Sequence, residues 1–204
     1  SFYNENTEGA VYPTPVIGMV GLLEDVSHST SITYKSEGDF IVCLGALNPT
    51  LGGSEYLKVV HGLIEGPIHN FDIKSELDVQ KLCLDGIREG LIKSAHDLSD
   101  GGLSVNISES ILHSDENIGA ELNLTRKLRS DELLFGECQS VIIVTVSEEN
   151  LHVLVEKALE LNVYTQTIGK VTNKGRLKIN DHIDIKKNKL NNSYFNSLET
   201  IMQS

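Results

Sequence analysis

One turn of the sequence, residues 97–102, combines carboxylates, a hydroxyl group and paired glycines. Asp97 and Asp100 supply hard oxygen atoms of the kind that Mg²⁺ prefers, and Ser99 lies between them. Gly101 and Gly102 follow directly, and glycines at the start of a helix allow backbone N–H groups to approach an anion closely. This combination is suited to a metal–phosphate pair. The alternative from spacing alone is that Ser99 or Asp100 is an N-cap and the two glycines serve packing.

The segments on either side of this turn predict a strand before it and a helix after it. Residues 91–95 are expected to form the strand, which ends where the polar turn begins. Leu103, Ile107 and Ile111 recur every fourth residue and give the following segment one apolar face, as in an amphipathic helix. The turn is therefore expected between two elements that pack into the core.

Elsewhere, apolar runs predict buried strands over residues 16–23, 39–44 and 141–146. Ser75 and Asp78 match a capping box, which predicts that a helix begins at Ser75. Residues 163–171 and 176–179 are expected to form a closing hairpin around residues 173–175, followed by one final helix over residues 190–201. Strands and helices interleave without a strict βαβ rhythm, so we expect an α/β (α+β) fold, a mixed-sheet α/β sandwich.

A second glycine-rich turn, Gly52-Gly53, is followed by Ser54 and a short helix expected to end at His61. Such a turn ahead of a helix is compatible with a phosphate-binding loop, but the lysine of that motif is missing. A structural turn capped by Ser54 is the better interpretation of these residues.

Composition limits the classes of partner. The chain of 204 residues has a formal net charge of −12, which argues against nucleic acid and anionic membranes as partners. No apolar run approaches the roughly 20 residues that span a bilayer, and no signal peptide opens the sequence. Its three cysteines are far apart and odd in number, as expected for reduced thiols, and we expect a cytoplasmic protein.

Four motifs together resemble the C-terminal part of the synthetase subunit of phosphoribosylformylglycinamidine synthase, in the aminoimidazole ribonucleotide synthetase superfamily. The motifs are SFYNENTEGAVYPTPVIGMVGLLEDV, LGGSEYL, SAHDLSDGGLSVNISES and LFGECQS. The resemblance implies a ligase of purine synthesis that uses ATP, Mg²⁺ and glutamine-derived ammonia to convert formylglycinamide ribonucleotide to formylglycinamidine ribonucleotide. It also implies two parts: residues 1–35, the tail of the second N-terminal synthetase-type domain with a strand remnant, and residues 36–204, the second C-terminal domain.

The resemblance assigns roles to three residues. Ser1 matches a serine that contacts substrate, Asp97 matches a carboxylate that holds Mg²⁺, and Ser99 matches a residue that touches nucleotide at an auxiliary site. No catalytic residue carries over, because the catalytic histidine and the main ATP-binding residues of the family fall outside these motifs. The chain alone is therefore expected to be inactive.

One motif departs from the family pattern. In Glu137-Cys138-Gln139-Ser140 the cysteine replaces a serine, and Val141 stands where arginine is common. Loss of the arginine removes a bidentate phosphate partner. The alternative role for Glu137 is that of a structural hydrogen-bond acceptor.

The resemblance to small-type enzymes implies as partners the rest of the synthetase chain, a separate glutaminase subunit and a small bridging subunit. Two alternatives stay open: a non-catalytic nucleotide-binding or scaffold module, and aminoimidazole ribonucleotide synthetase, which LGGSEYL and SFYNE disfavour. Because residues 16–23 are apolar on both faces, we also expect the isolated chain to form a homodimer through them or to fold them back onto its own domain.

Overall fold

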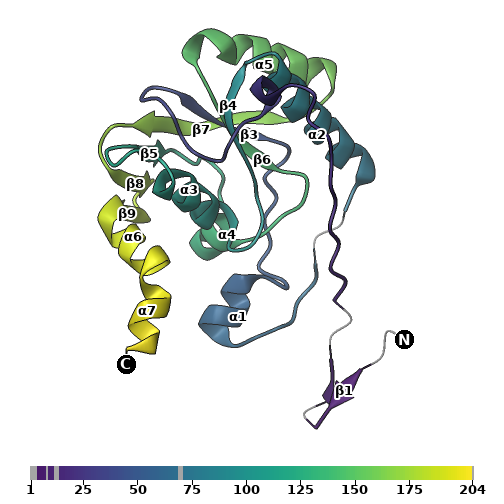
Figure 1. Ribbon diagram of the computed structural model, residues 1–204, viewed down its shortest axis with the longest axis vertical. Coiled ribbons are helices and arrows are strands. Elements are labelled where there is room, and N and C mark those ends of the chain that lie inside the picture. The colour runs from purple at the N-terminus through teal and green to yellow at the C-terminus, as the bar shows by residue number, and fades with distance from the viewer. Residues whose placement is uncertain (1–3, 8, 12–13, 69–70, 204) are drawn as a thin grey trace.

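A mixed sheet of seven strands, in the order β4-β6-β3-β7-β5-β8-β9, forms the centre of the molecule (Figure 1). The computed structural model describes residues 4–7, 9–11, 14–68 and 71–203. The strands are β3 (Phe40–Leu44), β4 (Ile92–Asp97), β5 (Gly119–Leu122), β6 (Ile142–Val146), β7 (Thr165–Thr172), β8 (Arg176–Ile179) and β9 (Ile183–Lys186). The β5–β8 pair is parallel and the other pairs of this sheet are antiparallel. A separate two-stranded sheet joins β1 (Glu5–Asn6) to β2 (Gly9–Ala10).

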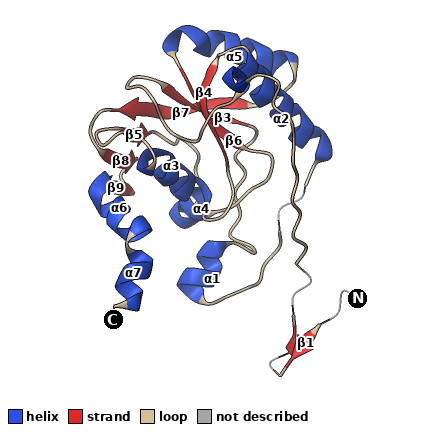
Figure 2. Cartoon of the chain, in the orientation of Figure 1, coloured by secondary structure: helices blue, strands red, loops and turns tan. Residues whose placement is uncertain are grey.

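Helices lie on both sides of this sheet, which confirms the predicted α/β sandwich (Figure 2). They are η1 (Val26–His28, a 3₁₀ turn), α1 (Glu55–His61), α2 (Ile73–Arg88), α3 (Gly102–Leu112), α4 (Ser130–Phe135), α5 (Glu148–Glu160), α6 (Lys187–Phe195) and α7 (Ser197–Met202). Ile41 of β3 packs in the cluster that contains α3, whereas Val42 packs in the cluster that contains α2 and α5. Because alternate residues of β3 enter different cores, its apolar run is continuous, as predicted for a strand buried on both faces.

The predicted start of α2 was wrong by two residues. The N-cap is Asp72, whose carboxylate accepts a hydrogen bond from Ser75 N at 2.9 Å, and the helix begins at Ile73. Ser75 therefore lies inside the first turn as the donor of this bond, and it does not cap the helix. A carboxylate at this position also faces the positive end of the helix dipole.

The predicted closing hairpin was also wrong. The strands β7 and β8 are not neighbours, because β5 lies between them and pairs in parallel with β8. The hairpin at this end of the sheet joins β8 to β9, a strand that the sequence analysis missed. The expected single final helix is divided at Asn196 into α6 and α7.

Residues 16–23 do not form the predicted buried strand. In the described part of the chain no strand pairing includes them, and the exposed fractions of Val16 and Val20 are 96% and 103%. They also do not fold back as a strand of the domain. The outer edge of β4 is taken by Ser31, which forms a parallel bridge to Ser94 and accepts a hydrogen bond from Ala95 N at 3.1 Å. Part of that edge is therefore already paired within the domain, by residue 31 and not by residues 16–23.

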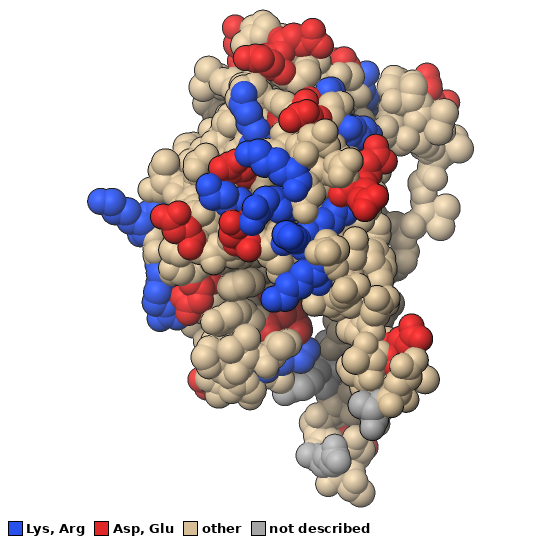
Figure 3. Space-filling view, turned by 90° about the vertical axis from the view of Figure 1, so that its left-hand side faces the viewer, with Lys and Arg blue, Asp and Glu red and all other residues tan. Residues whose placement is uncertain are grey.

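Lysine and arginine side chains gather near the middle of one face, with carboxylates between them (Figure 3). Lys174 and Lys178 both contact the carboxylate of Glu121, at 3.2 and 3.1 Å, and Arg176 pairs with Asp184. These hydrogen bonds lower the pKa of Glu121. These three cations of the sheet region are thus partly neutralised by neighbouring carboxylates.

Among the described residues, no helix combines the length and the apolar character needed to cross a bilayer.

Candidate functional site

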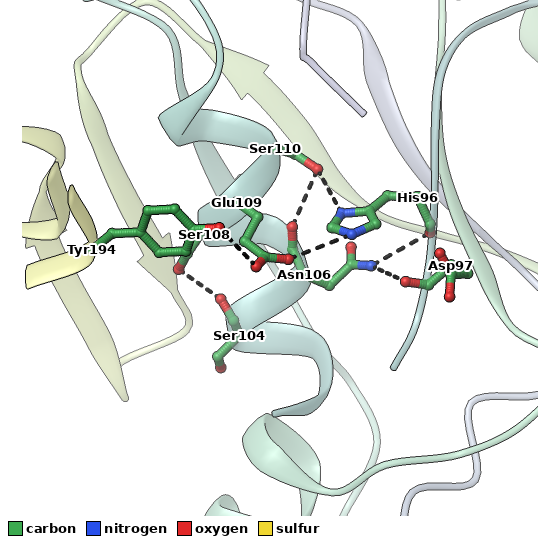
Figure 4. A network of polar contacts seen from close by, with 8 residues as sticks. All are labelled: His96, Asp97, Ser104, Asn106, Ser108, Glu109, Ser110 and Tyr194. Carbon is green, nitrogen blue, oxygen red and sulfur yellow. Dashed lines mark hydrogen bonds and ion pairs between the residues drawn. The ribbon is translucent and has the colours of Figure 1, made fainter. Parts of the chain in front are cut away.

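The turn after β4 has a fixed backbone and exposed side chains. Asp97 is the last residue of β4, and its carbonyl oxygen accepts a hydrogen bond at 2.7 Å from the side-chain amide of Asn106, a buried residue of α3 (Figure 4). Leu98 is buried and donates to Val141 O at 2.9 Å. The side chains of Asp97, Ser99 and Asp100 are exposed. The structure therefore brings together the two described residues of the predicted site and presents them to solvent.

The two glycines of this turn are required by backbone conformation and packing. Gly101 and Gly102 have φ angles of 78° and 69°, in the left-handed region that favours glycine. A Cβ atom on Gly102 would lie 2.5 Å from the carbonyl oxygen of Gly136 and 2.7 Å from the carbonyl carbon of Phe135. The start of α3 thus rests directly on the backbone that follows α4.

Glu137 supplies the acceptor at the start of α3. Its Oε1 atom accepts hydrogen bonds from Gly101 N and from Glu55 N, each at 2.9 Å. Gly102 N in turn donates to Ser99 O at 3.1 Å. The expectation of free backbone amides awaiting an anion is therefore wrong for both glycines. The alternative of a Ser99 or Asp100 cap is also wrong, because Gly101 is the N-cap residue and has no side chain to accept a bond.

The helix α1 brings a cation close to this turn, which the sequence analysis missed. Lys58 forms a 2.8 Å ion pair with Glu55; that hydrogen bond, and to a lesser degree the charge of Asp100, raises the pKa of Lys58. Ser54 caps α1 as predicted, by accepting from Leu57 N. A Cβ atom on Gly52 would lie 2.0 Å from the carbonyl oxygen of Pro67, so the second glycine-rich turn is packed against protein, as a structural turn requires.

The carboxylates of the turn fit Mg²⁺ only as part of a larger ligand set. Within the described ranges, no group of three or more His, Cys, Asp and Glu side chains is placed to hold a metal ion. Mg²⁺ in proteins is commonly bound by one or two carboxylates, with waters and substrate phosphates completing the octahedron. Asp97 and Asp100 supply two exposed carboxylates, as that pattern requires.

A polar network behind the turn connects β4 to α3 and α6 (Figure 4). The ring of His96 contacts Ser110 Oγ at 3.3 Å through Nδ1 and Glu109 Oε2 at 3.4 Å through Nε2. Tyr194 of α6 donates to the other carboxylate oxygen of Glu109 at 3.4 Å. These contacts join β4 to α3, the two elements between which the turn lies, and join α3 to α6.

The Glu137-Cys138-Gln139 segment divides into an internal and an exposed part. Cys138 is buried, and burial raises the pKa of its thiol to about 11, so the thiol is protonated at neutral pH. Gln139 is exposed and, with Ser140 and the N-terminal residues of α2, lines a cavity of about 300 Å³. Ser1, the predicted substrate residue, lies outside the described residues.

Residues 36–182 match the family described as AIR synthase related protein, C-terminal domain. The phosphoribosylformylglycinamidine synthase subunit PurL of Alkaliphilus metalliredigens is 37% identical in an alignment of 207 residues that covers 100% of this chain and 28% of that relative. The PurL subunit of a Thermoanaerobacter species is 44% identical over 174 residues, 85% of this chain and 24% of the relative. The chain thus spans 24–28% of the length of these two relatives.

Solved structures give the same fold. Thermotoga maritima PurL complexed with FGAR superposes with a TM-score of 0.68 at 19% identity, over 81% of this chain and 30% of that chain. The complex of the same protein with AMPPCP gives a TM-score of 0.64 at 20% identity, over 81% and 28%. At these identities the likeness shows the fold alone. The family match over residues 36–182 shows that the chain belongs to the AIR synthase related family, through that family's C-terminal domain.

Proposed function

We propose that this chain is the C-terminal segment of an ATP-dependent ligase that converts formylglycinamide ribonucleotide and glutamine-derived ammonia to formylglycinamidine ribonucleotide. The relatives named above are subunits of phosphoribosylformylglycinamidine synthase, and one spans the whole of this chain. In this proposal residues 1–35 complete a preceding N-terminal domain and residues 36–204 form the C-terminal domain. The partners are the rest of the synthetase chain, a glutaminase subunit and a small bridging subunit, in the cytoplasm.

In the assembled enzyme, Asp97 would hold Mg²⁺, Ser99 would contact the nucleotide and Ser1 would contact the ribonucleotide substrate. The observation that carries the first two roles is the presentation of both exposed side chains on one turn, whose backbone Asn106 and Glu137 hold in place. When an amide is activated by ATP, Mg²⁺ neutralises the phosphate charge. The residues of this chain bind and orient that charge, and the bond-making groups come from elsewhere in the enzyme.

A second candidate is a nucleotide-binding scaffold that takes no part in turnover. It is favoured by the hydrogen bond from the Gly101 amide to Glu137, which removes that amide from any role toward a reacting phosphate. In this alternative the nucleotide stabilises the contact between the segment and its neighbours.

Titration of the full-length synthetase with ADP and Mg²⁺ tests the site. Asp97→Asn is expected to weaken binding by about 1–3 kcal/mol, the scale of losing a charge-assisted contact, and the loss should vanish without Mg²⁺. Asp181→Asn, at an exposed turn before β9, is the matched control and should bind as the wild type does.

Equal affinities of the wild type and Asp97→Asn would remove Asp97 from the site. Ammonia-dependent activity separates the two candidates. Loss of activity in Asp97→Asn supports the ligase role of the turn, whereas full activity with weakened ADP binding supports the scaffold.

A further inference from the structure

We propose that Glu137 is the positioning residue of the candidate nucleotide site: one carboxylate oxygen holds the turn of residues 97–101 and the start of α1 in a fixed relation. The inference rests on the proposed function of this turn, and it assigns a role to a residue whose own side chain is not expected to touch the nucleotide.

The contact geometry supports this role. Glu137 Oε1 accepts hydrogen bonds from the backbone amides of Gly101 and Glu55, which lie 36 and 82 residues away in the sequence. The backbone of Glu137 is itself anchored, because it exchanges two hydrogen bonds with Thr50, at 2.9 and 3.0 Å. Thr50 lies in the segment that leads into α1. The side chain of Glu137 therefore extends from a fixed backbone and joins the start of α1 and the start of α3 to it.

The charge of Glu137 adds a second effect. A carboxylate next to the first amides of a helix interacts favourably with the helix dipole, where a bound phosphate would otherwise be stabilised. With this position taken, a phosphate at the α3 start would meet both a like charge and the packed backbone of Phe135 and Gly136. The nucleotide is thereby directed to the exposed side chains of Asp97 and Ser99, and to the nearby charge of Lys58.

Removal of the carboxylate is expected to release the turn. Gly101 N and Glu55 N would lose their acceptor, and two consecutive glycines in the left-handed region would leave the backbone free to take other conformations. Asp97 and Ser99 would then no longer be held relative to α1. Glutamine at this position keeps an acceptor oxygen of similar reach, so it should preserve the geometry while removing the charge.

The test uses the full-length synthetase with Glu137→Ala and Glu137→Gln, and with Glu160→Ala at an exposed position of α5 as the control. Affinity for ADP with Mg²⁺ should fall about tenfold in Glu137→Ala, stay within about threefold of wild type in Glu137→Gln, and not change in the control. Glu137→Ala should cost less in an Asp97→Asn background than in the wild type, because the Asp97 contact is already lost there and only that of Ser99 remains to be weakened. Independent, additive losses, or an unchanged affinity in Glu137→Ala, would overturn the proposal.

Hydrogen exchange of peptides covering residues 53–58 and 97–104 provides a readout that does not depend on the nucleotide. Both peptides should exchange faster in Glu137→Ala and at the wild-type rate in Glu137→Gln, while a core peptide over β6 is unchanged. Equal exchange in all variants would refute the holding role even if the nucleotide binds. Conversely, faster exchange in an enzyme without Asp97-dependent binding would refute the proposed function and leave Glu137 as the residue that joins these two segments.

Discussion

Replacement of Gly102 by alanine tests how closely the start of α3 is packed, and the chain offers a matched control. Gly102 and Gly90 have nearly the same φ angles, 69° and 70°. A Cβ atom on Gly90 would meet nothing within 4 Å, whereas on Gly102 it would lie 2.5 Å from a backbone oxygen. The two alanine variants therefore share the conformational cost and differ in the steric clash.

The magnitudes follow from these two contributions. A left-handed conformation costs a residue with a Cβ atom about 1–2 kcal/mol, which is the whole expected effect in Gly90→Ala. In Gly102→Ala the backbone of Phe135 and Gly136 must also move, and insertion of an atom into a packed region costs about 1–3 kcal/mol more. We therefore expect Gly102→Ala to lower the free energy of unfolding by about 2–5 kcal/mol in total.

Urea unfolding of the 204-residue chain, followed by circular dichroism, measures both values. The difference should also lower the melting temperature of Gly102→Ala below that of Gly90→Ala, by about 2–4 °C for each kcal/mol. If the proposed function is correct, only Gly102→Ala should weaken the binding of ADP with Mg²⁺ by the full-length protein. Equal destabilisation by the two variants would refute the packing argument for the start of α3.

Three further predictions use other features of the fold. Lys187 is buried and donates to the carbonyl oxygens of Ser114 and Asp115, at 2.8 and 2.9 Å, so Lys187→Met should destabilise the chain in urea by about 1–3 kcal/mol more than Lys189→Met; equal values would contradict this. Burial raises the pKa of the three thiols from 9.0 to about 11 or 12. Thiols of the unfolded chain therefore ionise at lower pH than those of the folded chain. The free energy of unfolding should fall as pH rises above about 9, by up to about 1.4 kcal/mol per pH unit for each thiol. Cys83→Ala should reduce this dependence on pH, and an unchanged dependence would contradict the prediction. In sedimentation equilibrium, the whole chain should self-associate through residues 16–23 more than a chain that starts at Ser36, and two monomers of equal solubility would disprove this.

Local patterns of the sequence correctly predicted the elements that bury a regular set of their own apolar side chains. The face of Leu103, Ile107 and Ile111 is fully buried against the sheet, as its spacing indicated. The apolar run of residues 40–44 forms a strand between two cores for the same reason. In both cases the apolar side chains whose burial stabilises the element lie close together in the sequence, so their spacing predicts the structure.

The errors concern interactions between distant residues. Residues 173–175 indicated a reversal of the chain but not its new neighbour, since strand pairing depends on the whole sheet and β5 occupies the place beside β7. The apolar run at 16–23 showed that both faces favour burial, but not which part of a molecule would cover them. The link from Glu137 to Gly101 and Glu55 spans 36 and 82 residues, so no local motif contains it.

The order of strands in the sheet also has a consequence for synthesis on the ribosome. Among the described strands of the seven-stranded sheet, only β8 and β9 pair with a sequence neighbour. β3 and β4 both pair with β6, which begins only at Ile142, and β5 pairs with β7, which begins only at Thr165. These pairs therefore cannot form until the later strand has been synthesised. A nascent chain thus carries its most apolar strand unpaired while about a hundred further residues are added, at about 5–20 residues per second. Such long-range pairing slows folding, and it leaves the apolar β3 segment of the emerging chain exposed to aggregation.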